Sequence, residues 1–113
     1  MADIQLTAVD NGKSYTVRVG DRVIIRLPEP AAGGGHLWQV EHLDSEIVAL
    51  ESKQVEPPPQ PPAASPRAGA DRTAILTFTA KGPGQTAIEL KAARPWDPAS
   101  VANRFRVEIS VTG

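Results

Sequence analysis

Alternation between apolar and polar residues is the feature that most restricts what this chain can fold into. The clearest case is the segment FRVEISV at 105–111, where Phe, Val, Ile and Val alternate with Arg, Glu and Ser. Successive side chains of an extended strand point to opposite faces, so one face of this segment is apolar and the other is polar. Such a segment is typical of a half-buried β-strand rather than a helix.

The same pattern recurs along the chain in the segments YTVRV (15–19), RVIIRL (22–27), ILTFTA (75–80) and IELKA (88–92). Each predicts a strand with one buried face. The residues assigned to the buried faces are Tyr15, Val17, Val19, Val23, Ile25, Leu27, Leu76, Phe78, Ala80, Ile88, Leu90, Phe105, Val107, Ile109 and Val111. The segment from Leu43 to Val55 could form a helical turn, but its β-branched residues favour a strand.

Turn residues separate these strands at hairpin spacing. Asn11-Gly12 lies between two extended runs and predicts a β-hairpin. VGDR and KGPGQ predict further turns. Seven or eight strands separated by such turns predict an all-β fold, namely a β-sandwich.

Length and composition are consistent with one domain spanning residues 1–113. The segment EPPPQPPAASPRAGAD, at 56–71, contains six of the eleven prolines. Proline lacks a backbone donor and fixes φ, so this segment cannot be a central strand. We expect a long surface loop, partly in the polyproline II conformation. Its P-x-x-P spacing could also bind an aromatic groove, although inert linkers share this composition.

Charge and cysteine content exclude several functional classes. A net charge of −1 gives no reason to expect a nucleic-acid or membrane partner. The absence of cysteine excludes disulfides, thiolate zinc sites and a cysteine nucleophile, and leaves the redox compartment open. The first six residues do not resemble a signal peptide, which predicts either a cytoplasmic protein or a mature periplasmic or secreted domain. We expect a monomer without cofactors.

An enzymatic function has little support in the sequence. His36 and His42 would lie about 20 Å apart in an extended strand, too far to share a metal ion. The carboxylates are scattered and show no spacing suited to acid–base chemistry. Phosphate-binding glycine loops and a Ser-His-Asp arrangement are not recognisable. We therefore expect neither a metal site nor an enzyme.

The two tryptophans have different sequence contexts. Trp38 begins a strand, and burial between the two sheets is its simplest interpretation. Trp96 lies in RPWDP, between two prolines that restrict the loop before binding. Tryptophan and arginine are enriched in interface hot spots, so Trp96 could anchor a partner. It could equally fold back over the end of the sandwich.

The glycine run in EPAAGGGHLW suggests a second functional loop. Ala31 and Ala32 have little bulk, and Gly33 to Gly35 permit positive φ and close approach of another backbone. A flexible strand connection would have the same composition. The alternative is a narrow loop tip that can enter a cleft.

These segments together resemble the chagasin-like inhibitors of papain-family cysteine peptidases. The resemblance is carried in order by VGDRVIIRLPEPAAGGGHLW, RAGADRTAILTFTAKGPGQTAIEL, and RPW followed by RFRVEISV. The element RPW after an alternating strand is the most specific part. The resemblance implies an immunoglobulin-like β-sandwich whose functional loops cluster at one end.

The resemblance also implies a mode of action. Three loops would fill the active-site cleft of the peptidase, one entering beside the catalytic Cys and His and the others packing on either side. The residues implied to contact the peptidase are Pro30, Ala31, Ala32, Gly33, Gly34, Ala68, Gly69, Ala70, Arg94, Pro95 and Trp96.

Three residues of the first loop differ from the family motif Asn-Pro-Thr-Thr-Gly. Ala31 and Ala32 replace the two threonines, and each lost hydroxyl removes a hydrogen bond with a net value of about 0.5–1.5 kcal/mol. Glu29 replaces the asparagine and would add a negative charge near the catalytic thiolate. These changes leave open a second interpretation, a non-inhibitory binding module that has kept the sandwich but lost the inhibitory loop.

Overall fold

A computed structural model of the chain describes residues 2–29, 37–56, 72–94, 96–97, 101 and 103–113. Eight strands occur within these ranges, as the alternation predicted. The elements are β1 (Asp3–Leu6), the 3₁₀ turn η1 (Ala8–Asp10), β2 (Ser14–Arg18), β3 (Arg22–Glu29), β4 (Leu37–His42), β5 (Val48–Glu56), β6 (Arg72–Ala80), β7 (Gly84–Ala93) and β8 (Asn103–Thr112). None of the described segments contains a helix long and apolar enough to cross a membrane.

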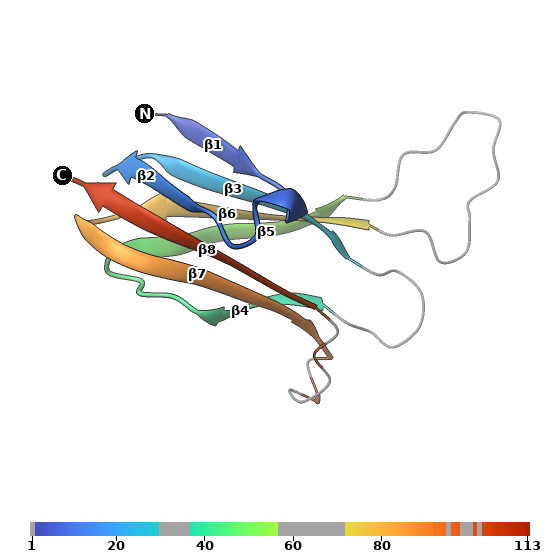
Figure 1. The fold of residues 1–113 in the computed structure, drawn as a ribbon. Coiled ribbons are helices and arrows are strands. Elements are labelled where there is room, and N and C mark those ends of the chain that lie inside the picture. Colours follow the sequence, from blue (N-terminus) through green and yellow to red (C-terminus); the bar gives the residue numbers. More distant parts are fainter. Residues whose placement is uncertain (1, 30–36, 57–71, 95, 98–100, 102) are drawn as a thin grey trace, which may run out of the picture.

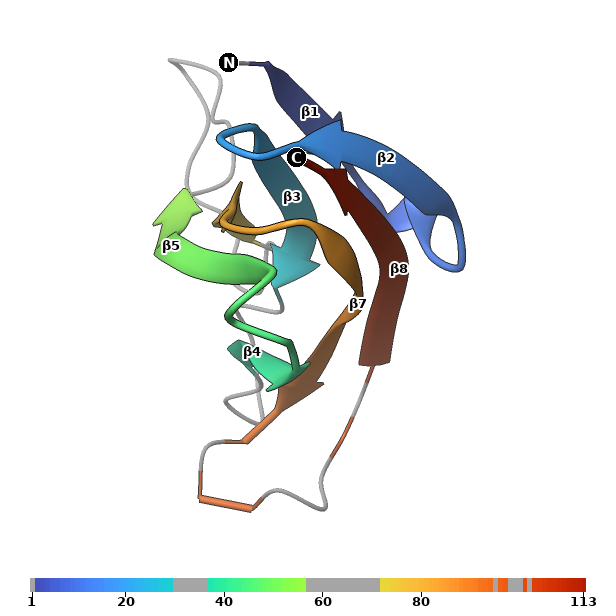
Figure 2. The same cartoon turned by 90° about the vertical axis from the view of Figure 1, so that its left-hand side faces the viewer.

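The strands form two four-stranded sheets packed face to face (Figure 1). Sheet A has the order β1-β3-β6-β5, and sheet B has the order β2-β8-β7-β4. The first strand of each sheet is parallel to its neighbour, and every other pair is antiparallel. This is the ABED and GFC arrangement of an immunoglobulin-like sandwich, with the first strand divided between the sheets. Strands β1 and β2 lie at one edge, and β4 and β5 at the other (Figure 2).

The core consists of the apolar faces that the sequence pattern identified. Nearly all residues assigned to buried faces are buried, and the largest fully buried side chains are Phe78 and Phe105. Tyr15 is only partly buried. The assignment of Val19 was wrong: β2 ends at Arg18, and the Val19 side chain is exposed because the chain has already turned toward β3.

The predicted hairpin at Asn11-Gly12 was also wrong, because β1 and β2 lie in different sheets. Gly12 has the positive φ of +85° that favours glycine in turns. Its N–H, however, donates to the carbonyl of Arg106 at 2.7 Å, and the Asn11 side-chain carbonyl accepts from the Arg106 N–H at 2.9 Å. The turn therefore docks the chain onto β8 of the opposite sheet instead of returning it to β1.

Two aspartates fix the crossovers between the sheets on either side of β2, Asp10 before the strand and Asp21 after it. Asp10 accepts hydrogen bonds from the Tyr15 hydroxyl and from the Thr7 N–H. The Tyr15 hydroxyl is the main cause of the lowered pKa of Asp10, and the same bond raises the pKa of Tyr15. Asp21 accepts from the backbone N–H groups of Ala2 and Arg18, which lower its pKa. Each carboxylate satisfies donors that the sheets leave unpaired.

The segment between β4 and β6 is a strand, as its β-branched residues indicated. Residues 45–47 form a turn, and β5 then runs from Val48 to Glu56 along β6. Glu56 is the last residue of this strand, although the sequence placed it in the proline-rich loop. The rest of that loop, 57–71, lies outside the described residues.

Candidate functional site

The roots of three loops meet at one end of the sandwich, which we call the loop end. Strands β3, β5 and β7 end there, and β4, β6 and β8 begin there (Figure 1). The register places Glu29 opposite Arg72 in sheet A, and Ala92 opposite both Trp38 and Asn103 in sheet B. Strand β1 begins and β8 ends at the opposite end (Figure 1). The roots of the loops 30–36, 57–71 and 94–102 are thus brought together, as the resemblance implied.

Most of the predicted contact residues belong to loop segments beyond the described residues. These are Pro30, Ala31, Ala32, Gly33, Gly34, Ala68, Gly69, Ala70 and Pro95. Arg94 and Trp96 are described, and they lie directly after the end of β7.

Trp96 projects into solvent from a tight turn. The Asp97 N–H donates to the Arg94 carbonyl at 3.0 Å, and the two residues form an isolated β-bridge. Trp96 lies between them, and 72% of its surface is exposed. The interpretation that its ring folds back over the sandwich is therefore wrong. A large aromatic residue held in solvent next to a rigid sheet is available for contact with another protein.

Trp38 is a core residue, as expected. Its side chain is buried, and its indole Nε1–H donates to the carbonyl of Pro28 at 2.8 Å. Pro28 precedes the last residue of β3, whereas Trp38 is the second residue of β4. The tryptophan thus ties together the two strands that flank the loop 30–36, and it links sheet A to sheet B.

Glu29 does not present its charge at the loop tip, so this expectation was wrong. The residue is fully buried. Its carboxylate Oε2 accepts from the backbone N–H of Trp38 at 2.9 Å and forms an ion pair with Lys53 Nζ at 3.3 Å. Alternation could have located it: Glu29 follows Val23, Ile25 and Leu27 on the inward face of β3. Because Glu29 is charged and has a proline on either side, it did not look like part of the alternating pattern of β3.

Two further side chains contact the loop roots, and no pattern in the sequence points to either. Lys53 of β5 donates from Nζ to the Trp38 carbonyl at 2.7 Å, with 29% of its side chain exposed. Gln39 of β4 donates from Nε2 to the carbonyl of Ala93 at 3.2 Å, at the root of the turn that carries Trp96. Both contacts join residues far apart in the sequence, which a pattern of neighbouring residues cannot reveal.

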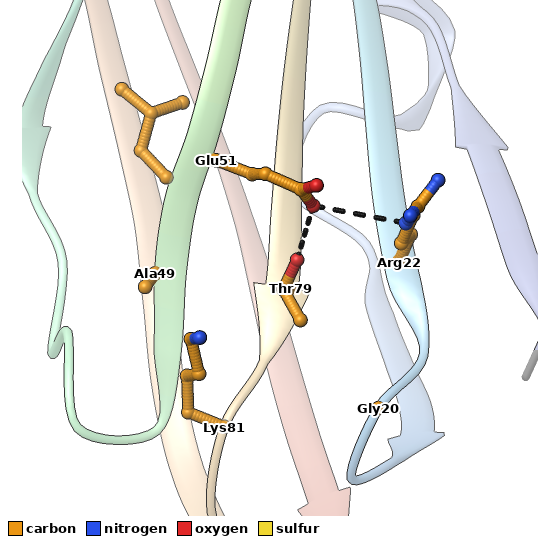
Figure 3. Close-up of a pocket in the computed structure, with 7 residues that line it drawn as sticks. Gly20, Arg22, Ala49, Glu51, Thr79 and Lys81 are labelled. Carbon is orange, nitrogen blue, oxygen red and sulfur yellow. Dashed lines mark hydrogen bonds and ion pairs between the residues drawn. The ribbon is translucent and has the colours of Figure 1, made fainter.

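A catalytic or metal centre is not evident in the described part of the chain. There, no group of three His, Cys, Asp or Glu side chains could hold a metal ion. His42 is exposed at the end of β4, and His36 lies outside the described residues. A shallow hollow on the outer face of sheet A is crossed by the ion pair of Arg22 and Glu51, at 3.7 Å, and by the bond from Thr79 to Glu51 (Figure 3). Two of its charged residues, Arg22 and Glu51, thus pair with each other, and Lys81 also lines the hollow.

Comparison with solved structures shows the same fold over almost the whole chain. The cysteine protease inhibitor EhICP2 of Entamoeba histolytica matches with a TM-score of 0.82 and 18% identity, over 98% of this chain and 96% of that one. The solution structure of Amebosin matches with a TM-score of 0.72 and 20% identity, over 98% and 97%. PbICP-C, solved in complex with falcipain-2, matches with a TM-score of 0.55 and 20% identity, over 96% and 90%.

A search of curated protein sequences finds no match. The family model described as "Chagasin family peptidase inhibitor I42" matches residues 16–111, from β2 to the end of the core in β8. This match leaves out β1 but reaches strands of both sheets and all three loops of the loop end. The chain therefore belongs to the chagasin family of peptidase inhibitors, which are not enzymes.

Proposed function

We propose that this protein is a reversible inhibitor of papain-like cysteine peptidases, and that the whole chain, 1–113, acts as one inhibitor domain. The observation that carries this proposal is the exposed ring of Trp96 at the end of the sandwich where the three loop roots meet. Membership of the chagasin family supplies the class of target. PbICP-C, which shares the fold, was solved in complex with falcipain-2.

Each loop has a separate role in this proposal. Pro30, Ala31, Ala32, Gly33 and Gly34 enter the cleft beside the catalytic Cys and His, where their small side chains allow close approach. Arg94, Pro95 and Trp96 pack against one wall of the cleft. Ala68, Gly69 and Ala70 pair with the other wall. Inhibition then results from occupation of the cleft, without a covalent step.

The roots of the loops favour this division of roles. The loop 30–36 runs from sheet A to sheet B, because β3 and β4 lie in different sheets. The loop 57–71 starts and ends in sheet A, and the loop 94–102 starts and ends in sheet B. The loop proposed to enter the cleft therefore has one root in each sheet, whereas each flanking loop is rooted in a single sheet.

The direct test is inhibition of papain and of a cathepsin L-type enzyme by the purified protein. We expect competitive inhibition with a sub-micromolar constant, full recovery of activity on dilution, and recovery of uncleaved inhibitor. Cleavage of the protein as a substrate, or loss of inhibition after one turnover, would contradict occupation of the cleft.

The alternative, a non-inhibitory binding module, is favoured by one observation: Ala31 and Ala32 stand where hydroxyl-bearing threonines are expected. Two lost hydrogen bonds would weaken binding by about tenfold or more. This alternative predicts no effect on papain-like peptidases even at high micromolar protein. Deleting residues 57–62 tests whether the proline-rich segment has a role of its own. Inhibition should survive the deletion if that segment is only a spacer.

A further inference from the structure

We infer that Glu29 and Lys53 are positioning residues that fix the roots of the inhibitory loops by occupying the free edge of β4. The effect that we expect the pair to have on inhibition rests on the proposed function. The effect that we expect it to have on the structure of the loop end does not. Neither residue lies among the predicted contact residues, and both act through Trp38.

The edge of β4 that faces away from β7 is hydrogen-bonded by side chains at Trp38. Strand β4 is at the margin of sheet B, and β7 is its one partner among the described strands, with Trp38 opposite Ala92. An edge strand normally leaves backbone groups without a neighbour. At Trp38 the N–H donates to Glu29 Oε2 at 2.9 Å, and the carbonyl accepts from Lys53 Nζ at 2.7 Å. One acidic and one basic side chain thus supply the acceptor and donor of a neighbouring strand.

Both side chains come from loop roots of the opposite sheet. Glu29 is the last residue of β3, directly before the loop 30–36, and Lys53 lies three residues before the end of β5, where the loop 57–71 begins. The next residue of β4, Gln39, donates to the carbonyl of Ala93, at the root of the loop 94–102. Two consecutive residues of β4 are therefore bonded to the roots of all three loops.

The burial of Glu29 argues that the pair fixes geometry rather than adding stability alone. Glu29 is fully buried, and removing a carboxylate from water is costly unless a cation and hydrogen bonds compensate. An apolar pair of similar volume would often be equally stable. It could not bind both the N–H and the carbonyl of Trp38. The polar pair specifies one position of β4 relative to sheet A, whereas apolar packing would tolerate several.

Substitution of Lys53 tests the inference with least damage to the core, because part of that side chain reaches solvent. Lys53→Met keeps the length of the side chain and removes both donated bonds, and Lys53→Arg restores a cation with several donors. Val107→Ala is the matched control, because it destabilises the core in β8 without contacting a loop root. Each variant is first confirmed to be folded at the assay temperature.

Three quantities are then compared: the inhibition constant, the exchange rate of the Trp38 amide by NMR, and backbone relaxation of residues 30–36. We expect Lys53→Met to raise the inhibition constant by about tenfold or more, because loops that are less ordered lose more entropy on binding. Trp38 exchange and mobility of 30–36 should rise with it. Lys53→Arg should recover most of each effect, and Val107→Ala should leave the inhibition constant within about twofold of wild type.

The inference is overturned if Lys53→Met and Val107→Ala change the inhibition constant alike for a given loss of stability. It is also overturned if Lys53→Met leaves both Trp38 exchange and the relaxation of 30–36 at wild-type values. If the wild-type protein inhibits no peptidase, the proposed function fails, and the two NMR measurements still decide the role of the pair.

Discussion

Replacing Trp96 with alanine is the sharpest test of how the loop end binds. The exposed fraction of Trp96, 72%, sets the surface that a partner can cover. A tryptophan buries about 150–250 Å² when it is enclosed, so about 180 Å² is available here. At about 25 cal/mol per Å², full burial corresponds to about 4.5 kcal/mol as an upper value. Alanine retains part of this surface, and ordering at the interface opposes the rest.

We therefore expect Trp96→Ala to weaken inhibition by about 2–4 kcal/mol, or about 30- to 900-fold in the inhibition constant. The free energy of unfolding should change by less than about 0.5 kcal/mol, because the ring is exposed and makes little contact with the core. The inhibition constant is measured by competitive titration against papain, and stability by urea unfolding. Most of the loss should appear as faster dissociation.

Val9→Ala is a suitable control for this experiment. Val9 has a similar exposed fraction, 78%, but belongs to η1 between β1 and β2. It should leave the inhibition constant unchanged. If wild-type protein inhibits and Trp96→Ala inhibits equally well, Trp96 does not contact the peptidase and the assignment of the loop 94–102 is wrong.

Three further predictions concern the stability of the fold. The pKa of Asp10 is lowered from 3.8, chiefly by the Tyr15 hydroxyl, so its contribution to stability is present above about pH 4 and is lost as the pH falls through the lowered value. Asp10→Asn should therefore be less stable than wild type at pH 7, and unfolding curves should show this difference shrinking below pH 4. Gly84→Ala should cost more than about 1 kcal/mol in urea unfolding, because φ is +143° and the added Cβ would lie 2.9 Å from Ile47 Cδ1. Ile47→Ala in the same background should recover only the steric part of that loss, and full recovery would show that the positive φ costs nothing. Phe78→Ala removes a fully buried ring at the centre of sheet A and should cost about 3–5 kcal/mol by the same measurement, whereas a loss below 1 kcal/mol would mean that the core collapses around the cavity.

The sheet content and the core were predictable because alternation is a local property. Val23, Ile25 and Leu27 reveal their common face within six residues, and burial follows once any second sheet covers them. Which sheet each strand joins is not a local property of the sequence. Asn11-Gly12 has the composition of a hairpin turn, but the bonds that decide its direction come from Arg106, about 95 residues away.

The candidate site was predictable to a different degree. The position of Trp96 between two prolines after a strand permitted both an exposed and a folded-back ring, and the structure decides for exposure. The buried state of Glu29 followed from alternation but conflicted with its charge. The bonds from Lys53 and from the Trp38 backbone resolve that conflict, and both partners lie on other strands whose position the local pattern does not reveal. Single-sequence patterns locate loops, but they do not show what holds the loops in place.

The open edge of the sandwich explains why the loop end needs polar bonds as well as a core. Apolar packing sets the distance between the sheets where all strands overlap, but in the part of the chain that the structure describes β4 and β5 are margins without a further strand beside them (Figure 2). A binding surface built from loops of both sheets depends on how those margins are placed, because loop 57–71 is rooted in sheet A and loop 94–102 in sheet B. At that end the bond from Lys53 to Trp38 joins the margins β5 and β4, and the bond from Glu29 joins the inner strand β3 to β4. The same bonds that close the edge of β4 thus set the spacing of the loops that we expect to straddle the peptidase cleft.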